Sequence, residues 1–159
     1  MTLNLKSERG HALFERLARD ADVVVENLGP GAVERLGLGY ERLRQINPRI
    51  VFASVKGFGS TGPYAQFKSY EWIAQAMSGV MSQTGPADGP PMRVHAGLGD
   101  TASGIHAAVG ILAALLQRQT TGVGQRIEIA QQDVVVNLRR VYFSELEKPG
   151  KAPAPAKKG

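Results

Sequence analysis

An aspartate at the start of a long apolar segment is the residue whose position best suits chemistry. Asp100 directly follows Gly97-Leu98-Gly99, and these small glycines would let a large ligand approach the backbone closely. At the start of a helix, free N–H groups and the helix dipole favour the ionised carboxylate. Such a carboxylate is a competent nucleophile toward an acyl carbon. The alternative is that Asp100 or Thr101 merely caps the helix.

Three cations are further candidates because each lies beside an expected strand end or loop. Ligands of α/β proteins usually bind at such places, and Lys6, Arg35 and Lys68 together could hold a polyphosphate. Scattered surface charges are, however, most often simply solvated. Glu71 follows Tyr70 at the start of an expected helix, where an acid is electrostatically favoured without any function.

Several other kinds of site are excluded by missing motifs. The sequence has no phosphate loop ending in GK[ST], no G-x-G-x-x-G and no G-x-S-x-G elbow. The chain has no Cys, which removes disulfides, thiolate zinc sites and Cys nucleophiles. His11, His95 and His106 are scattered, with no pair at i, i+4 on one helix. We therefore expect no metal site.

The elements that must position these residues follow from apolar spacing and β-branched runs. The run Val23-Val24-Val25 suits a strand buried on both faces. Ser7 is a plausible cap for the first helix. The expected strands are 23–25, 50–55 and 126–130; the expected helices are 7–19, a short one ending near residue 36, 40–46, 70–81, 101–119 and 132–146. In the 101–119 helix, Ile105, Val109, Leu112, Leu115 and Leu116 form a wide apolar stripe, which typically faces a core.

Helices that alternate with β-branched strands indicate an α/β fold, here a partial Rossmann-like domain with a mainly parallel sheet covered on both faces. Three strands are fewer than the roughly 5–6 of a typical sheet. We therefore expect an incomplete domain, or one that a partner completes.

The positive charge lies mostly in the last residues. The formal net charge is +5, and residues 148–159 (KPGKAPAPAKKG) contribute four Lys and no acid. This tail is expected to be disordered, while residues 1–147 form the domain. Nucleic-acid binding would depend on the tail alone, so we expect neither nucleic-acid nor membrane partners. With no apolar run of about 18 residues and no signal region, the sequence predicts a cytoplasmic protein.

Several longer stretches, in order, resemble family III CoA-transferases, especially the formyl-CoA:oxalate CoA-transferases. They are LNLKSERG, ADVVVENLGPGAVERLGLGYERLRQINPRIVFASVKGFGSTGPY, KSYEWIAQAMSG, DGPP, GLGDTASGIHAAVGILAALLQRQTTGVGQRIEI and QQDVVVNL. The resemblance covers about Leu3 to Ser144 and implies the interlaced-dimer fold of that family.

The resemblance implies roles for particular residues. The aspartate after the glycines, here Asp100, would attack an acyl-CoA thioester and carry an aspartyl-CoA thioester intermediate, with backbone N–H groups stabilising each oxyanion. Tyr70 and Glu71 would complete the catalytic site. The implied CoA contacts are Leu3, Asn4, Leu5, Lys6, Asn27, Leu28, Gly29, Arg35, Lys68, Ser69, Tyr70 and Glu71. The implied substrates are an acyl-CoA and a small carboxylic acid, with no permanently bound cofactor.

Two alternatives remain open at this stage. Acyl-CoA racemases of the same superfamily use a His-Asp pair where this chain has Tyr70-Glu71, and Tyr is a poor base, so transferase is favoured. The family also has an N-terminal segment with an active-site Gln, a downstream glycine-rich loop and a second, smaller domain, all of which we expect to be missing here. The chain would then be a truncated, non-catalytic CoA-binding or dimerisation fragment, forming a homodimer or joining a complementary chain.

Overall fold

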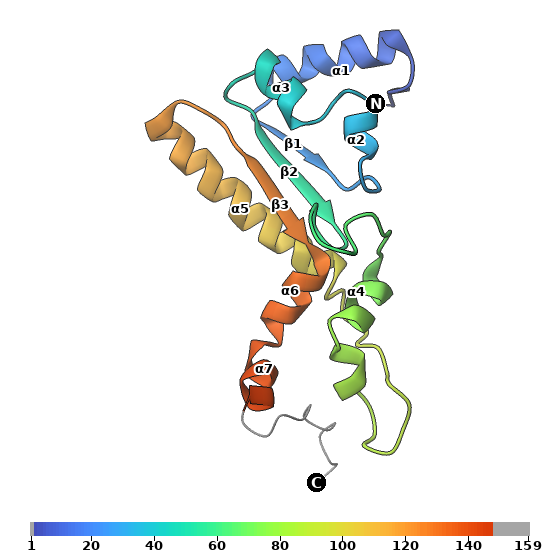
Figure 1. Cartoon of the computed structure of the whole chain (residues 1–159). Coiled ribbons are helices and arrows are strands. Elements are labelled where there is room, and N and C mark those ends of the chain that lie inside the picture. Colours follow the sequence, from blue (N-terminus) through green and yellow to red (C-terminus); the bar gives the residue numbers. More distant parts are fainter. Residues whose placement is uncertain (1, 148–159) are drawn as a thin grey trace.

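Three parallel strands form the sheet at the centre of the molecule (Figure 1). The computed structural model describes residues 2–147. The strands are β1 (Val23–Glu26), β2 (Val51–Lys56) and β3 (Arg126–Ala130), in the order β1-β2-β3. Val23 pairs with Val51, and Lys56 pairs with Ala130. The predicted α/β fold with a parallel sheet is confirmed, and all three strands lie where the sequence predicts them.

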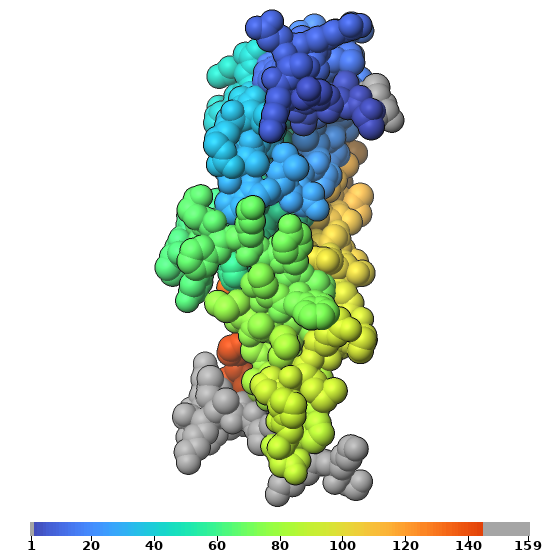
Figure 2. All heavy atoms as spheres, turned by 90° about the vertical axis from the view of Figure 1, so that its right-hand side faces the viewer, coloured from blue at the N-terminus to red at the C-terminus, as the bar shows by residue number. Residues whose placement is uncertain are grey.

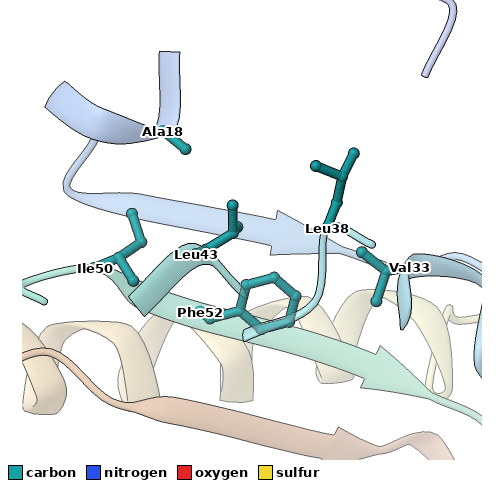
Figure 3. Packing of buried hydrophobic residues seen from close by; sticks show 6 residues of the cluster. All are labelled: Ala18, Val33, Leu38, Leu43, Ile50 and Phe52. Atoms are coloured by element: carbon teal, nitrogen blue, oxygen red, sulfur yellow. The ribbon is translucent and has the colours of Figure 1, made fainter. Parts of the chain in front are cut away.

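Helices cover the two faces of this sheet. α1 (Glu8–Asp20), α2 (Ala32–Arg35) and α3 (Tyr40–Ile46) lie on one face, and α5 (Asp100–Thr121) packs along β2 and β3 on the other (Figure 1). Under the first group, Leu43 and Phe52 belong to a buried cluster in which the side chains point toward one another (Figure 3). The Ser7 hydroxyl accepts a hydrogen bond from Gly10 N at 3.1 Å, so the predicted cap of α1 is confirmed.

A second group of helices lies beyond the carboxyl ends of the strands. It contains α4 (Glu71–Met77), the 3₁₀ helix η1 (Val80–Gln83), α6 (Gln131–Leu138) and α7 (Arg140–Glu147). The sequence predicts only two helices here, and both predictions miss a break. Gly79 ends the first with φ of 81°, and Arg139 interrupts the second. The buried Arg139 guanidinium donates to Ser78 O at 2.8 Å and to the Gln83 side chain, so the two breaks are tied together.

The predicted packing of two apolar surfaces is wrong. Val25 is 59% exposed, because α5 packs mainly along β2 and β3 and leaves this face of β1 uncovered. Four large residues of α5 also point outward, with exposures of 60–67% at Ile105, Val109, Leu112 and Leu116, whereas Leu115 is partly buried. The buried face of α5 is made instead of Ser103, Ala107 and Ala114. Small side chains bring this helix close to the sheet: a Cβ on Gly110 would lie 3.1 Å from Ile127 Cγ2.

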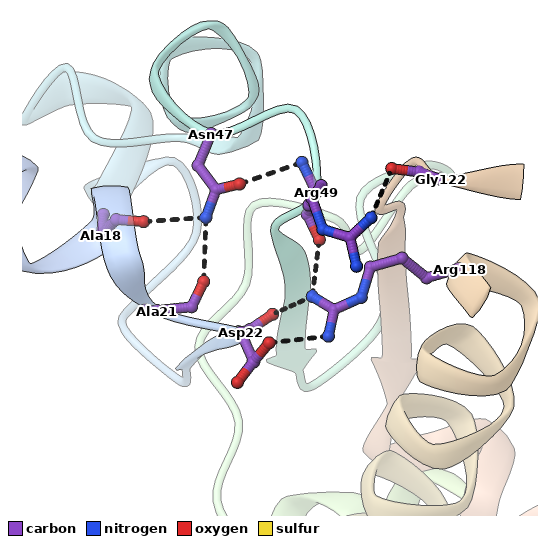
Figure 4. Close-up of polar contacts among 7 residues, drawn as sticks. All are labelled: Ala18, Ala21, Asp22, Asn47, Arg49, Arg118 and Gly122. Atoms are coloured by element: carbon purple, nitrogen blue, oxygen red, sulfur yellow. Dashed lines mark hydrogen bonds and ion pairs between the residues drawn. The ribbon is translucent and has the colours of Figure 1, made fainter.

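At the other end of the sheet, where the strands begin, polar contacts connect the helices to the strands (Figure 4). The Arg118 guanidinium reaches from α5 to Asp22 Oδ1 at 2.7 Å and to Arg49 O at 2.9 Å. The Asn47 amide donates to Ala18 O and Ala21 O, the carbonyls at the end of α1. Polar side chains therefore join the helices and the strands at this end of the sheet.

Candidate active site

A cleft of about 860 Å³ opens at the carboxyl ends of β1 and β2. Its walls are the 25–30 segment after β1, the end of β2, residues 67–70, the first turn of α5 and Gln131. Figure 2 shows this side of the molecule, with the green segment that follows β2 lying below the blue N-terminal elements. The volume lies within the range of small-molecule and cofactor sites.

A buried ion pair fixes the turn after β1. Lys56 Nζ donates to Glu26 Oε2 at 2.8 Å and to Leu28 O at 2.7 Å, and Leu28 N donates back to Glu26 Oε2 at 3.0 Å. The side chains of Lys56 and Glu26 are only 9% and 7% exposed, and Ser54 Oγ donates to the other Glu26 oxygen. Sequence reasoning missed this pair, although a charged last residue on each of two buried strands was a visible signal.

The segment that carries Lys68 and Tyr70 is pressed against the end of β2. A Cβ on Gly57 would lie 2.1 Å from Ser69 Cβ, so only glycine permits this approach. Tyr70 is 73% exposed and lines the cleft. Within residues 2–147, the Lys68 ammonium and the Arg35 guanidinium have no hydrogen-bonded or ion-paired partner. Both cations line the cleft and are available for an anionic ligand.

Asp100 lies in the same cleft and is solvent-exposed. Its Oδ1 accepts a hydrogen bond from Gln131 Nε2 at 2.7 Å. In the described part of the chain, neither Asp100 nor Thr101 accepts a hydrogen bond from the N–H groups that open α5. The capping alternative is therefore wrong: this carboxylate is turned toward the cleft and Gln131.

Glu71 caps α5 from a neighbouring helix. Although it is the first residue of α4, its carboxylate accepts from Gly99 N at 3.0 Å and from Asp100 N at 2.7 Å. Gln75, one turn along α4, donates to the same carboxylate at 2.6 Å. Burial raises the pKa of Glu71, but hydrogen bonds from Gln75 and from the Asp100 and Gly99 amides outweigh it and hold the pKa below its usual value of 4.5. Glu71 thus positions the backbone of Asp100.

Replacing Glu71 by Gln is expected to lower the free energy of unfolding by about 1–2 kcal/mol at neutral pH, the usual cost of a lost charged cap. The folded-state pKa lies below 4.5, so the wild-type advantage is complete above that pH. It is lost as the pH falls through the lowered folded-state value. Urea unfolding of both proteins across this range measures the difference. A difference that stays constant on acidification would contradict the assigned role.

The glycines before Asp100 serve packing rather than ligand access. A Cβ on Gly99 would lie 2.9 Å from Ala74 Cβ, and one on Gly97 would lie 2.5 Å from Thr101 Oγ1. Neither glycine lines the cleft, so the predicted close approach of a ligand at these positions is wrong. The open position is Gly104, one turn into α5, where an added Cβ would meet nothing within 4 Å.

The structure brings most of the sequence-predicted residues together, but not all. The cleft is lined by Asn27, Leu28, Gly29, Arg35, Lys68, Ser69, Tyr70 and Asp100. Leu5 and Lys6 line an adjoining hollow of about 520 Å³ at the start of α1, which shares Arg35 with the cleft. Of the described residues predicted to contact CoA, Leu3, Asn4 and Glu71 line neither space. Asn4 instead builds the turn before α1, since its carbonyl accepts from Ser7 N at 3.1 Å.

Two of the three histidines, His11 and His106, have structural partners. His11 Nε2 bonds to Leu36 O at 2.9 Å, and His106 contacts Ala102 O and the Asn137 amide. Residues 2–147 contain no cluster of three or more His, Cys, Asp or Glu side chains that could hold a metal ion. Over the same residues, no helix combines the length and the apolar character that a membrane crossing requires.

Comparison with known proteins gives a consistent result. The sequence profile of CoA-transferase family III matches residues 1–159. A formyl-CoA:oxalate CoA-transferase of Streptomyces avermitilis is 54% identical over 153 residues, which cover 96% of this chain and 37% of that enzyme. One of the same name from Escherichia coli is 46% identical over 146 residues, which are 92% of this chain and 35% of the enzyme.

Solved structures agree in fold. A CAIB/BAIF family protein from Brucella suis superimposes with a TM-score of 0.93 at 35% identity, over 98% of this chain and 41% of that one. A hypothetical protein from Mycobacterium tuberculosis gives a TM-score of 0.87 at 32% identity, over 95% and 43%. The chain thus spans well under half the length of the relatives it matches.

Proposed function

The chain belongs to CoA-transferase family III, and we propose that it carries the nucleophile and part of the CoA site of an enzyme that moves CoA between carboxylic acids. The observation that carries the proposal is the placement of an exposed, ionisable Asp100 in the same cleft as the free cations Arg35 and Lys68. A carboxylate near cations at strand ends suits a substrate that joins a reactive acyl group to phosphates.

The chemistry proceeds through exchange at three carbonyl carbons: the acyl carbon of the donor, Cγ of Asp100 and the acyl carbon of the acceptor. An Asp100 oxygen attacks the acyl carbon of the donor thioester, the C–S bond breaks, and CoA leaves as a thiolate. The thiolate attacks Cγ of Asp100, which releases the donor acid and leaves an aspartyl-CoA thioester. The acceptor carboxylate then attacks Cγ and expels the thiolate. The thiolate attacks the acyl carbon of the acceptor, which forms the new CoA thioester and frees the Asp100 carboxylate. No step needs a net proton. Together, the steps replace one difficult transfer of CoA between two acids by several easier ones.

CoA is proposed to lie across the cleft from the adjoining hollow toward Asp100. The cations Lys6, Arg35 and Lys68 bind its phosphates. The guanidinium of Arg35 can donate two parallel hydrogen bonds to one phosphate, whereas the lysine ammonium groups act as point charges. The rigid turn of Asn27, Leu28 and Gly29 contacts the adenosine, and Ser69 and Tyr70 flank the thioester. Glu71 acts by holding the Asp100 backbone. Leu3 and Asn4 contribute through the turn that precedes α1 rather than through the cleft wall.

Transfer is favoured over racemisation by what lines the cleft. Racemisation needs a base and an acid on opposite faces of the α-carbon. Among the described residues none of the histidines lines the cleft, so no imidazole is in place there to act as such a base or acid. The names of the Streptomyces and Escherichia relatives suggest formyl-CoA as the donor and oxalate as the acceptor.

Association with a second chain is part of this proposal. The exposed residues Ile105, Val109, Leu112 and Leu116 form one apolar face of α5, and a contiguous apolar face is a usual mark of an interface. A second copy, or a complementary chain of the same family, is proposed to cover it. Light scattering should give at least twice the 17.0 kDa of one chain; a strictly monomeric chain at all concentrations contradicts the self-association.

Calorimetric titration with CoA tests the binding half of the proposal. Replacing Lys68 by Ala is expected to weaken binding by roughly 1 kcal/mol, or about fivefold in Kd, because a free cation facing a phosphate is lost. The loss should shrink as ionic strength rises, since the interaction is exposed to screening. Binding without any exchange activity would favour a non-catalytic CoA-binding module.

The matched control is Arg44→Ala, which removes an exposed cation of α3 that lines neither the cleft nor the hollow. It changes the net charge by the same amount and should leave the Kd unchanged. If both variants weaken CoA binding equally, the phosphates of CoA do not bind in the cleft. If wild type binds no CoA, the proposed function fails.

A further inference from the structure

Gln131 connects α6 directly to the carboxylate of Asp100. The residue is 8% exposed, and its side chain lines the cleft and donates from Nε2 to Asp100 Oδ1 at 2.7 Å. We propose that Gln131 is a catalytic residue that stabilises the oxyanion formed on Asp100 whenever its carbonyl carbon is attacked. This inference depends on the proposed function above, because it concerns the reactivity of the aspartyl intermediate.

Gln131 contacts one of the two carboxylate oxygens of Asp100, Oδ1. When Asp100 forms an anhydride, one carboxylate oxygen makes the new bond and the other remains a carbonyl oxygen. When the thiolate or the acceptor acid attacks Cγ, electrons move onto that carbonyl oxygen, and they return when the leaving group departs. Oδ1 is held by Gln131, whereas Oδ2 has no hydrogen-bond partner among residues 2–147. The free Oδ2 is therefore the attacking atom, and Gln131 is in place for both later attacks on Cγ.

The backbone of α5 does not supply this donor. The sequence led us to expect that backbone N–H groups would stabilise the oxyanions, but the four N–H groups from Gly99 to Ala102 are already engaged. Gly99 N and Asp100 N donate to Glu71, and Thr101 N and Ala102 N donate to Gly97 O at 3.0 and 3.2 Å. Glu71 thus fixes the position of Asp100 and also occupies the groups that would compete with Gln131.

Gln131 stands on rigid elements, as an oxyanion donor must. It directly follows β3, whose last residue Ala130 pairs with Lys56 of β2. The next residue, Gln132, donates from its backbone N to Gly57 O at 3.0 Å. A neutral amide has a further advantage over a cation at this position. It stabilises the oxyanion by a hydrogen bond, but it does not neutralise the Asp100 carboxylate that must first attack the acyl carbon.

The experiment compares the breakdown of the aspartyl-CoA thioester in wild type and in Gln131→Met, which keeps the length of the side chain but has no donor. Hydroxylamine attacks Cγ of the adduct, and released CoA thiol is followed with time. We expect release to be roughly 10²-fold slower in the variant, the usual effect of removing one oxyanion donor. CoA affinity and the melting temperature should change little, which separates this role from a structural one.

The control is Gln132→Met, whose amide donates to Met77 O at 3.1 Å and does not line the cleft. It should release CoA at the wild-type rate. A Gln131→Met adduct that breaks down as fast as wild type overturns this inference and leaves the proposed function intact. Equal slowing in both variants also overturns it, because the effect then comes from the packing of α6. If wild type forms no adduct on Asp100, the proposed function itself fails, and this inference with it.

Discussion

Replacing Asp100 by Asn should lower the rate of CoA transfer by roughly 10³-fold or more, since the variant has no nucleophile to accept the acyl group. Asn keeps the shape of the side chain, and its amide oxygen still accepts from Gln131, so the cleft is preserved. CoA should therefore bind as it does to wild type. Transfer is measured by the appearance of the acceptor thioester, with formyl-CoA and oxalate as the first pair.

The matched control for this variant is Asp88→Asn, an exposed aspartate in the 85–91 turn that lies outside the cleft. It makes the same chemical change and should retain full activity. A transfer rate for Asp100→Asn within about tenfold of wild type would remove the nucleophile from the mechanism. An equal loss in both variants would point to net charge rather than to the site.

Replacing Lys56 by Met is expected to lower the free energy of unfolding by about 3–5 kcal/mol, because Glu26 is then left as a buried carboxylate without its cation. Both side chains are more than nine-tenths buried. The Leu28 carbonyl loses a donor at the same time, so the 27–29 turn should loosen and CoA affinity should fall. Urea unfolding followed by circular dichroism measures the change.

The control pair lies on the surface. Arg44 and Glu41 approach to 3.6 Å with 56% and 79% exposed side chains, and Glu41→Gln should cost less than about 1 kcal/mol. If Lys56→Met does not fold, the double variant Glu26→Gln with Lys56→Met should recover stability, because it removes the unpaired charge. A loss no larger than that of Glu41→Gln would show that the pair does not hold the turn.

The local elements were predictable from the sequence because their signals are local. The β-branched runs, the Ser7 cap and the glycines after α2 each act within a few residues, and the strands and α1 to α3 lie where predicted. The breaks at Gly79 and Arg139 were missed for the opposite reason. Arg139 leaves its helical conformation and donates to Ser78 O, 61 residues away in the chain, and no periodicity reports such a contact.

The α5 face shows the limit of hydrophobic patterning. The sequence locates an apolar stripe correctly but cannot say what covers it, and the sheet packs against Ser103, Ala107 and Ala114 instead. Within the site, the resemblance gave Asp100 and the CoA-contacting segments. It did not indicate that Glu71 would cap a different helix from its own or that Gln131 would hold Asp100 Oδ1. These contacts arise only when α4, α5 and α6 meet at the end of the sheet.

The most direct test of the account is to trap the intermediate. The chain is incubated with formyl-CoA, hydroxylamine is added, and the peptide that contains Asp100 is analysed by mass spectrometry. We expect an aspartyl hydroxamate at Asp100 that depends on the acyl-CoA and is missing from Asp100→Asn. Hydroxamate on another residue, or an unmodified Asp100 peptide under conditions in which CoA is being transferred, would contradict it.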